Sequence, residues 1–312
     1  MIYQNYGNSH PAAPYFSARE AHRWDLFCIP LPKYITQPGM FNLGSPQSSR
    51  KFIDLIFAAS SKWANWDPPK QIHVGDYGTI DKKTGEFEKE GNIYEDATTA
   101  EIATAHPPQT AAKDKTFEIS SNHVRRTEFS LEPTASIPGI AEASIKGEWR
   151  FSSKRGALLV MNQPRSTYIP PKALLKKLID VPELKDKYLA TETFSCPAYS
   201  LYLSSGEDEA VRLALLATVP LPTAVPLSVG GSIQSSWWNQ NTSGLFRCAS
   251  DNEYSYTPLY TLKRIRKPGL LRRDSPLPSA DDDDDLWEDV AQPWDPLDSD
   301  GEEQEFEDEV FD

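Results

Sequence analysis

The acidic and basic residues of this 312-residue chain are segregated on either side of Arg273. Residues 274–312 hold 18 of the 45 Asp and Glu residues and no Lys or Arg, so all 32 basic residues lie in residues 1–273. The net charge of −13 therefore divides into a body near +5 and a tail of −18. Like charges at this density repel each other, and a segment poor in apolar residues cannot build a core. The sequence predicts a folded body and a disordered acidic C-terminal tail.

The segment directly before the tail is strongly basic. Residues 263–273 read KRIRKPGLLRR, with six Lys or Arg and no acid. An anionic tail joined to a cationic edge can cover that edge, because many charges within a Debye length of about 8 Å compete with an outside anionic surface. The alternative is a tail that only improves solubility. The abrupt junction favours a tail that screens a functional basic surface.

Composition divides the chain into three regions. Residues 1–20 are rich in Pro, Asn and Ser and are expected to be flexible, residues 21–267 form the body, and residues 268–312 form a linker and the tail. The sequence also bears on where the protein is located. No apolar run reaches the 18 residues of a membrane-spanning helix, and no signal peptide is evident. The three cysteines are widely spaced, which is typical of a reducing compartment. We therefore expect a cytoplasmic protein.

Periodicity in the body predicts an α+β fold, with a twisted, mainly antiparallel β-sheet and a few short helices. Apolar residues at helical spacing predict a helix over residues 50–63. Residues 72–96 read as strand, turn and strand, with Gly85 in the turn. The segment PPKALLKKLID, from residue 170 to 180, predicts a short helix with Pro171 in its first turn and lysines on one flank.

The most regular segment is AEASIKGEWRF, residues 141–151. Apolar and polar residues alternate over all eleven positions, which predicts a strand with one apolar and one charged face. A turn-forming SSKRG segment then leads into ALLVM, residues 157–161, so a hairpin is expected. Residues 198–204 and 210–219 form a second candidate pair. The apolar face of the first strand comprises Ala141, Ala143, Ile145, Gly147, Trp149 and Phe151.

Catalytic motifs are scarce in this sequence. None of the five His residues lies at ligand spacing to another His or to a Cys, so no metal site is expected. No glycine-rich segment has the flanking residues of a phosphate loop, and no Ser lies in a nucleophile elbow. Asp76 and Asp81 flank a turn, where turn capping explains them better than acid–base catalysis. We expect a protein that is not an enzyme and needs no cofactor.

Amphipathic strands combined with basic clusters remain as the informative pattern. A single alternating strand is usually a half-buried strand of a soluble protein, but a strand that crosses a membrane needs the same alternation. Polybasic segments bind anionic lipid with about 1 kcal/mol per Lys or Arg near the surface. The predicted lipid-binding residues are Lys172, Lys176, Lys177, Lys263, Arg264, Arg266 and Lys267.

Several segments resemble fungal gasdermin-like proteins, which execute regulated cell death. They are VGDYGTIDKKTGEFEKEGNIYED, GEWRFSSKRGALLVM, CPAYSLYLS and YTPLYTLKRIRK, and the resemblance runs from about residue 48 to 267. It implies binding to acidic phospholipids, oligomerisation of the chain with itself, and refolding of two hairpins into a large membrane pore. In such families a C-terminal segment restrains the pore-former until a protease removes it. The usual large inhibitory domain is missing here, so only the acidic tail could take that role.

Three hypotheses follow from the sequence. The first is a pore-forming cell-death effector, cytoplasmic when inactive and membrane-bound when active, with residues 141–151 as the inserting strand. The second is a nucleic-acid-binding module whose tail mimics nucleic-acid charge, although no RNA- or DNA-binding motif is present and no nucleic acid is expected. The third is a scaffold protein. For the first, an activating protease is expected to cut near Leu270, Leu271, Arg272, Arg273 and Asp274.

Overall fold

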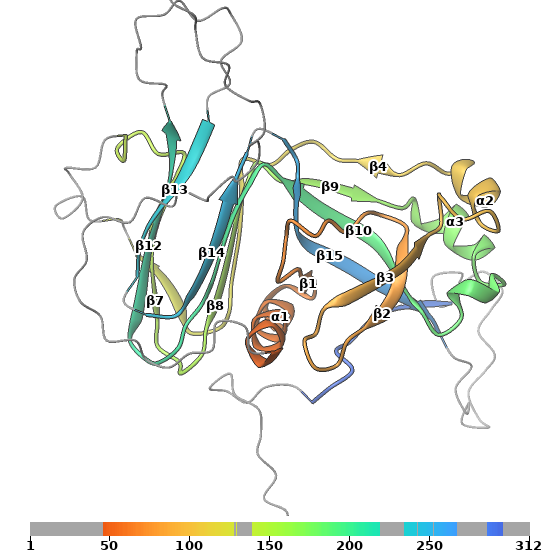
Figure 1. Cartoon of the computed structure of the whole chain (residues 1–312), viewed down its shortest axis with the longest axis horizontal. Coiled ribbons are helices and arrows are strands. Elements are labelled where there is room, and N and C mark those ends of the chain that lie inside the picture. Colours follow the sequence, from red (N-terminus) through yellow and green to blue (C-terminus); the bar gives the residue numbers. More distant parts are fainter. Residues whose placement is uncertain are drawn as a thin grey trace, which may run out of the picture.

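Antiparallel strands dominate the computed structural model (Figure 1), which confirms the predicted fold class. The structure describes residues 46–127, 129, 139–218, 234–241, 243–251, 253–266 and 286–295. Within these ranges the helical elements are α1 (Pro46–Ser60), α2 (Ala100–Thr104), α3 (Pro171–Lys177) and a 3-10 turn, η1 (Pro182–Leu184).

The largest sheet, called here the large sheet, is built around two long strands. Its main path runs in the order β1 (Trp63–Ala64), β15 (Tyr256–Ile265), β10 (Tyr188–Cys196), β2 (Asp76–Ile80) and β3 (Phe87–Asn92). Beside this path, β9 (Arg165–Tyr168) pairs with β10, β4 (Gln109–Thr110) pairs with β9, and β16 (Trp287–Asp289) pairs with β15. Strands β1 and β16 lie end to end on one edge of β15, because β10 occupies the other edge.

Two four-stranded sheets stand beside the large sheet. The inner sheet has the order β14 (Leu245–Ser250), β11 (Ala198–Leu203), β8 (Ala157–Asn162) and β5 (Thr116–Ser120). The outer sheet has the order β13 (Gln234–Asn241), β12 (Glu209–Thr218), β7 (Ile145–Phe151) and β6 (Val124–Thr127). Helix α1 lies between the inner sheet and the β2–β3 pair of the large sheet (Figure 1) and contacts β1, β5 and β8.

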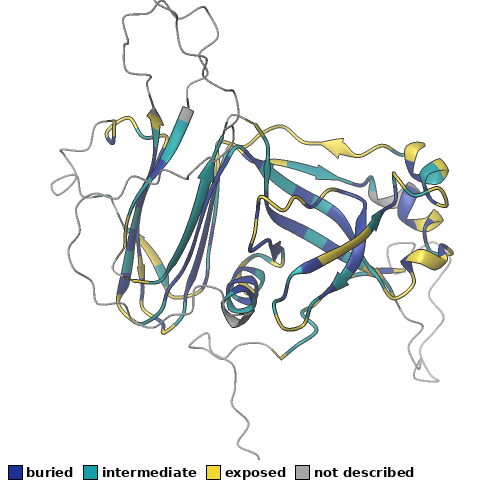
Figure 2. Cartoon of the chain, viewed as in Figure 1, coloured by how far each residue is buried: buried dark blue, intermediate teal, exposed yellow. Residues whose placement is uncertain are grey.

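Burial explains why the inner sheet is apolar on both faces. Leu159 and Met161 of β8 pack in the cluster that contains Phe52 and Ile56 of α1. The alternate residues of β8 face the outer sheet, where Leu158 packs in a second cluster. Strands covered on both sides read as continuous apolar runs rather than as alternating ones. The ALLVM run is such a strand, and the buried residues of the inner sheet stand out in Figure 2.

The local predictions hold for some elements and fail for others. The β2–β3 turn forms as expected, with Gly85 at φ +75°, and α3 matches the predicted short helix. The first helix begins at Pro46 and ends at Ser60, so Trp63 belongs to strand β1 instead. Residues 97–115 are rich in Ala, Thr, Pro and Lys, which predicts an exposed loop, but they contain α2 and β4.

Both predicted hairpins are wrong. β7 and β8 do not pair with each other, and neither do β11 and β12; each pair is divided between the outer and the inner sheet. β7 pairs with β12, and β8 pairs with β11. The predicted strand 141–151 also begins later, at Ile145, while Ala141 is exposed and Ala143 is half-buried outside it. A turn-forming segment such as SSKRG suits a corner between sheets as well as a hairpin, so local chemistry alone does not choose the partner strand.

Part of the acidic tail joins the folded body. Residues 286–295, called here the tail segment, contain β16 and pack against the large sheet and α1. Trp287 is 5% exposed and Val290 is 2% exposed. The residues between β15 and the tail segment, 267–285, and those after it, 296–312, lie outside the described ranges, as do residues 1–20 of the expected flexible N-terminus.

Candidate functional site

The tail segment adds a strand to the edge of the large sheet. β16 runs antiparallel to the end of β15, with Trp287 opposite Ile265. The backbone N–H of Arg266 donates to the carbonyl of Leu286 at 2.9 Å, which extends the ladder beyond the strand. Main-chain pairing of this kind fixes the position of an added strand without regard to its side chains.

A buried indole anchors the strand. The side chain of Trp287 lies in a buried cluster with Leu174 of α3 and with Leu178, which caps that helix; Ile265 of β15 packs against the same cluster. Its Nε1–H donates to the carbonyl oxygen of Leu175 at 2.8 Å. A buried indole with its N–H satisfied combines a large apolar contact with a directional bond. Trp287 therefore joins α3 to the end of β15.

Two more indoles hold the rest of the tail segment. Trp294 donates its Nε1–H to a carboxylate oxygen of Asp54 on α1 at 2.6 Å, and its ring meets that of Trp63 edge to face with centroids 6.0 Å apart. In return, Trp63 donates its own Nε1–H to the carbonyl of Val290 at 3.1 Å. The contacts extend from α3 to α1, so the tail segment spans the edge of the large sheet.

Opposite charges line the rim of this contact. Lys263 Nζ lies 2.7 Å from a carboxylate oxygen of Asp289, and Arg264 Nε donates to Glu288 at 2.6 Å. Arg266 Nε lies 3.6 Å from the other oxygen of Glu288. These ion pairs are at least partly exposed, so each contributes at most about 1 kcal/mol. The tail segment thus covers three of the predicted lipid-binding residues, and apolar anchoring supplements the charge pairing.

The other predicted site residues are placed as follows. Lys176 and Lys177 are exposed on α3, and Lys177 Nζ lies 3.1 Å from His106 Nε2. Lys172 lies on the same helix, but its side chain is outside the described part, as are Lys267 and the predicted cleavage residues 270–274. The elements that carry the two predicted basic clusters, α3 and β15, are brought together at Trp287.

The inner and outer sheets form a single folded ribbon. Four chain segments each cross from one sheet to the other, and both sheets have the same order of segments: β14/β13, β11/β12, β8/β7 and β5/β6. The four crossings make one corner at which a four-stranded antiparallel ribbon, called here the folded ribbon, is bent back on itself. Figure 1 shows the two halves standing side by side on the left.

The two central segments keep one register through the corner. Phe151 pairs with Glu209 in the outer sheet, and Ala157 pairs with Leu203 in the inner sheet, so residues 152–156 and 204–208 face each other with equal lengths. The two segments at the edges of the ribbon, β5–β6 and β13–β14, cross with only three residues each, 121–123 and 242–244. The central pair therefore has the same register on both sides of the corner.

In each central segment, both strands carry apolar residues at odd-numbered positions. In β7, odd-numbered residues, including Ile145, Trp149 and Phe151, pack between the two sheets. In β8, odd-numbered residues pack on the far side of the inner sheet, toward α1. Because a strand has a period of two, a straightened β7–β8 segment would carry all these apolar residues on one face. The β11–β12 segment shares this phase, with Tyr199, Leu201, Leu203, Val211, Leu213 and Leu215.

A buried carboxylate holds the corner. Glu209, 6% exposed, accepts hydrogen bonds from the hydroxyls of Tyr202 (2.7 Å), Ser205 (2.5 Å) and Ser243 (2.5 Å) and from the Ser205 backbone N–H. Burial and this hydrogen bond to Glu209 raise the pKa of the Tyr202 hydroxyl. Left-handed backbone at Asp208 and Gly244 makes the turn, and at a non-glycine residue such a conformation costs about 1–2 kcal/mol. The corner is thus a strained bend fastened by polar contacts.

The outer face of the ribbon carries a second buried carboxylate. Glu148 is 3% exposed and accepts hydrogen bonds from Arg212 Nε at 2.7 Å and Arg150 Nε at 2.9 Å. These hydrogen bonds, that of Arg212 above all, hold the pKa of Glu148 below its ordinary value of 4.5. The charged face predicted for this strand exists, and on it Glu148 is buried under two arginines.

We expect Glu148→Gln to lower the free energy of unfolding by about 1–3 kcal/mol at pH 7. Because the pKa of Glu148 is lowered on folding, its carboxylate stabilises the fold above the unfolded pKa, and this contribution is lost as pH falls through the folded value. Denaturant unfolding between pH 3 and 7 should therefore show the two proteins converging below about pH 4.5. A constant difference across this range would contradict the assignment.

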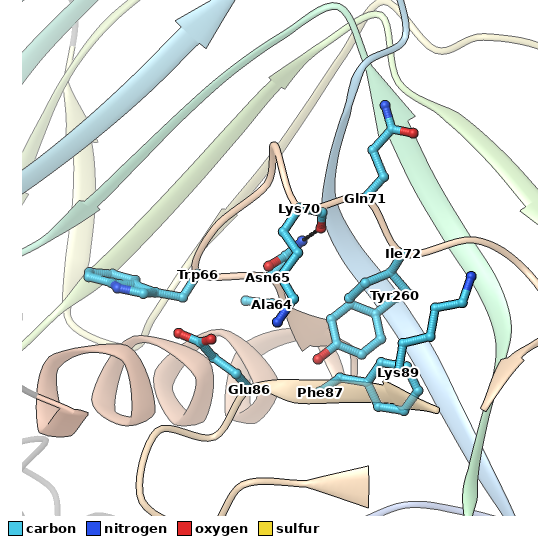
Figure 3. A pocket seen from close by; sticks show the side chains of 10 residues that line it. All are labelled: Ala64, Asn65, Trp66, Lys70, Gln71, Ile72, Glu86, Phe87, Lys89 and Tyr260. Atoms are coloured by element: carbon cyan, nitrogen blue, oxygen red, sulfur yellow. Dashed lines mark hydrogen bonds between the residues drawn. The ribbon is translucent and has the colours of Figure 1, made fainter. Parts of the chain in front are cut away.

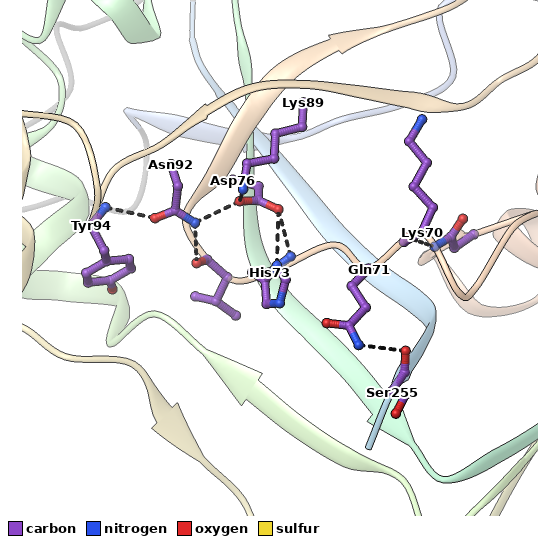
Figure 4. A network of polar contacts seen from close by, with 10 residues as sticks. Lys70, Gln71, His73, Asp76, Lys89, Asn92, Tyr94 and Ser255 are labelled. Carbon is purple, nitrogen blue, oxygen red and sulfur yellow. Dashed lines mark hydrogen bonds and ion pairs between the residues drawn. The ribbon is translucent and has the colours of Figure 1, made fainter. Parts of the chain in front are cut away.

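The network around Asp76 is structural. Asp76 is fully buried and lies 2.7 Å from Lys89 Nζ, 2.7 Å from Asn92 Nδ2 and 2.8 Å from the backbone N of His73 (Figure 4). A carboxylate with this many partners fastens the loop before β2 to β3. A shallow hollow next to it, lined by Lys70, Lys89, Glu86 and Tyr260 among others (Figure 3), brings together no catalytic set.

In the described ranges no group of three or more His, Cys, Asp and Glu could hold a metal ion. Among the helices of the described residues, none is long and apolar enough to cross a membrane.

The residues that anchor the tail segment, Trp287, Val290 and Trp294, were not predicted from the sequence. Trp287 and Val290 lie in the LWEDV segment that directly follows five consecutive aspartates. Two aromatic residues, Trp287 and Trp294, within an acidic segment are a signal that could have predicted docking, since a purely solubilising tail does not need them.

Comparisons with known proteins do not assign this chain to a family. No family model matches it, and no curated protein matches it. Among solved structures, the gasdermin A3 membrane pore determined by cryo-EM is similar, with 10% sequence identity over 61% of this chain and 67% of that chain. Its TM-score is 0.17, a value too low to support an argument about fold or function. The gasdermin resemblance therefore stays a prediction from sequence.

Proposed function

We propose that this protein is a pore-forming membrane protein whose folded ribbon opens at its corner and inserts into acidic membranes as part of a homo-oligomer. The observation that carries the proposal is the folded ribbon itself: four segments cross the corner in the same order, and the central two keep one register. Opening the corner would preserve that central ladder while the short crossings of the outer segments adjust.

In the proposed pore the outer sheet is the inserting half, and its shorter strands would have to lengthen on insertion. A membrane-crossing strand needs about 9–11 residues with alternating faces, and β12 has ten. In β7, Ile145, Trp149 and Phe151 would face lipid, and Lys146 and Arg150 would face water. The corner segments, SSKRG at 152–156 and SSGED at 204–208, are polar and suit the membrane surface. The predicted inserting residues within β7 are thus retained, while Ala141 and Ala143 precede the strand.

The tail segment would restrain this opening and cover the lipid-binding edge. Glu288 and Asp289 pair with Arg264 and Lys263, which would otherwise bind lipid phosphates. Trp294 joins the tail segment to α1, and α1 also contacts the inner sheet. Removal of residues 274–312, by proteolysis in the predicted window or by displacement, would expose that edge. A role in cell death and activation by a protease are proposed only because the sequence resembles gasdermin-like proteins.

The test is the release of a dye from vesicles of acidic phospholipid by the chain with and without residues 274–312. We expect greater leakage from the shortened chain and little from vesicles of neutral lipid. Retention of labelled DNA or RNA without leakage would favour the nucleic-acid alternative instead. The absence of leakage from both chains, with both folded, would refute the pore.

The lysines of α3 provide a binding test that leaves the tail segment in place. Glu288 and Asp289 pair with cations of β15, whereas Lys176 and Lys177 lie on α3, so Lys176→Gln/Lys177→Gln should weaken co-sedimentation with acidic vesicles by about 2 kcal/mol, roughly 30-fold. The control is Lys82→Gln/Lys83→Gln in the β2–β3 turn, which removes the same charge elsewhere. Equal losses in both variants would show that only net charge matters.

A further inference from the structure

The edge of β15 together with the Trp287 pocket has the form of a peptide-binding site. It offers main-chain groups for an antiparallel strand, one deep apolar pocket and a rim of three cations. Sheets that receive extended peptides use the same division, in which main-chain bonds give affinity and side-chain pockets give specificity. We call these residues of β15 and α3 the strand-acceptor surface.

The occupant in the structure reveals which chemistry this surface selects. The carbonyl of Leu175 at the base of the pocket needs an N–H donor, so Trp fits where Phe would leave that carbonyl without its bond. The next two positions face Arg264 and Lys263 and call for carboxylates. The fourth position, filled by Val290, is buried and calls for an aliphatic side chain. The selected pattern is Trp, acid, acid, aliphatic.

The occupant is held in a way that permits exchange. β16 pairs with β15 over only three residues, and Asp289 is 77% exposed in its ion pair. The chain from Ile265 to Trp287 includes 21 intervening residues, so the tail segment is a tethered ligand rather than a strand in a tight hairpin. A tethered ligand competes at an effective concentration of up to about the millimolar range, which a strand of higher affinity can overcome.

We propose that the strand-acceptor surface binds, in trans, a strand of a separate partner protein that carries a Trp-acid-acid-aliphatic sequence. The partner would displace the tail segment without cutting the chain. A second copy of this chain is a poorer occupant, because exchanging tail segments between two copies gains no contact and loses the tether. The binding surface stands on the contacts alone; only the activating effect of displacement rests on the proposed pore.

The experiment measures fluorescence anisotropy of a labelled peptide of residues 286–295 with the full chain. The receptor is the Trp287→Ala/Trp294→Ala variant, whose own tail segment has lost two anchors. We expect the peptide to bind this variant at least tenfold more tightly than it binds the wild-type chain, where the surface is filled. A peptide with Trp287→Ala should lose at least tenfold in affinity. The control receptor, Trp238→Ala on β13, should behave as wild type.

Three results would overturn the proposal. One is no binding to the double variant when circular dichroism shows it folded. Another is equal binding of the peptide and its Trp287→Ala form, which would reduce the contact to charge alone. The last is concentration-dependent dimerisation of the wild-type chain that Trp287→Ala abolishes, which would make a second copy the occupant. Binding is read without membranes, so this test is separate from that of the pore.

Discussion

We expect Trp287→Ala to raise leakage of acidic phospholipid vesicles at least tenfold over the wild-type chain. The substitution removes a buried indole and its hydrogen bond to the Leu175 carbonyl. Truncating a buried Trp costs about 3–5 kcal/mol, and each 1.4 kcal/mol is about tenfold in an equilibrium. The docked state of the tail segment should therefore become a minority, while the three sheets, which do not depend on β16 for their order, remain folded.

Two controls make this result specific. Trp238→Ala removes a half-buried indole from β13, outside the tail contact, and should leak as wild type or less. Limited proteolysis should show residues 286–295 protected in the wild-type chain and cut in Trp287→Ala. A folded Trp287→Ala chain with an accessible tail and unchanged leakage would remove the tail segment from the restraint. Salt should change the wild-type baseline only in part, since the anchors are apolar as well as ionic.

A disulfide that joins the two halves of the ribbon away from the corner should abolish leakage altogether. Ser250 of β14 donates its Oγ–H to the carbonyl of Ser235 of β13 at 2.5 Å, so these residues lie side by side on the two halves of the ribbon. In a Cys248→Ser background, Ser235→Cys/Ser250→Cys would join the halves when oxidised. The ribbon could then not open, and we expect at least a hundredfold less leakage from a chain that lacks residues 274–312. Dithiothreitol should restore the leakage.

The matched control places the bridge within one half. Ser200 of β11 lies opposite Cys248 of β14 in the inner sheet, so Ser200→Cys can pair with the native thiol without spanning the corner. This bridge should leave leakage unchanged whether oxidised or reduced. If the chain with the oxidised bridge between positions 235 and 250 leaks as freely as its reduced form, the two halves do not separate and the proposed mechanism is wrong.

The structure limits which substitutions can test the inserting strand. Gly147 looks replaceable in the sequence, but a Cβ built there would lie 2.7 Å from the ring of Trp149. Gly147→Asp would therefore disturb the soluble fold as well as any pore. Ile145 lies 5% exposed between the sheets, so Ile145→Ser also costs stability. Substitutions on the apolar face of β7 affect both folding and insertion, so a bridge between the two halves of the ribbon is the better test of insertion.

The fold class could be predicted because it depends on local signals. Alternation along residues 145–151, the Gly85 turn and Pro171 at the start of α3 each specify an element from its own sequence. The charge reversal likewise predicted that acids would cover the basic edge, and Glu288 and Asp289 do so. These inferences needed no knowledge of which strands pair.

The pairing of the strands and the anchoring of the tail segment depend on contacts between residues that are distant in the sequence. Residues 152–156 have the composition of a hairpin turn, yet β7 and β8 lie in different sheets, because their apolar faces are buried when each pairs with a segment 36–70 residues away. Trp287 gains its pocket only where α3 meets the end of β15. Local sequence patterns predicted several of the elements, the alternating faces of β7 and the charge of each region. Long-range burial of those faces chose the partners, since one turn sequence is compatible with more than one pairing.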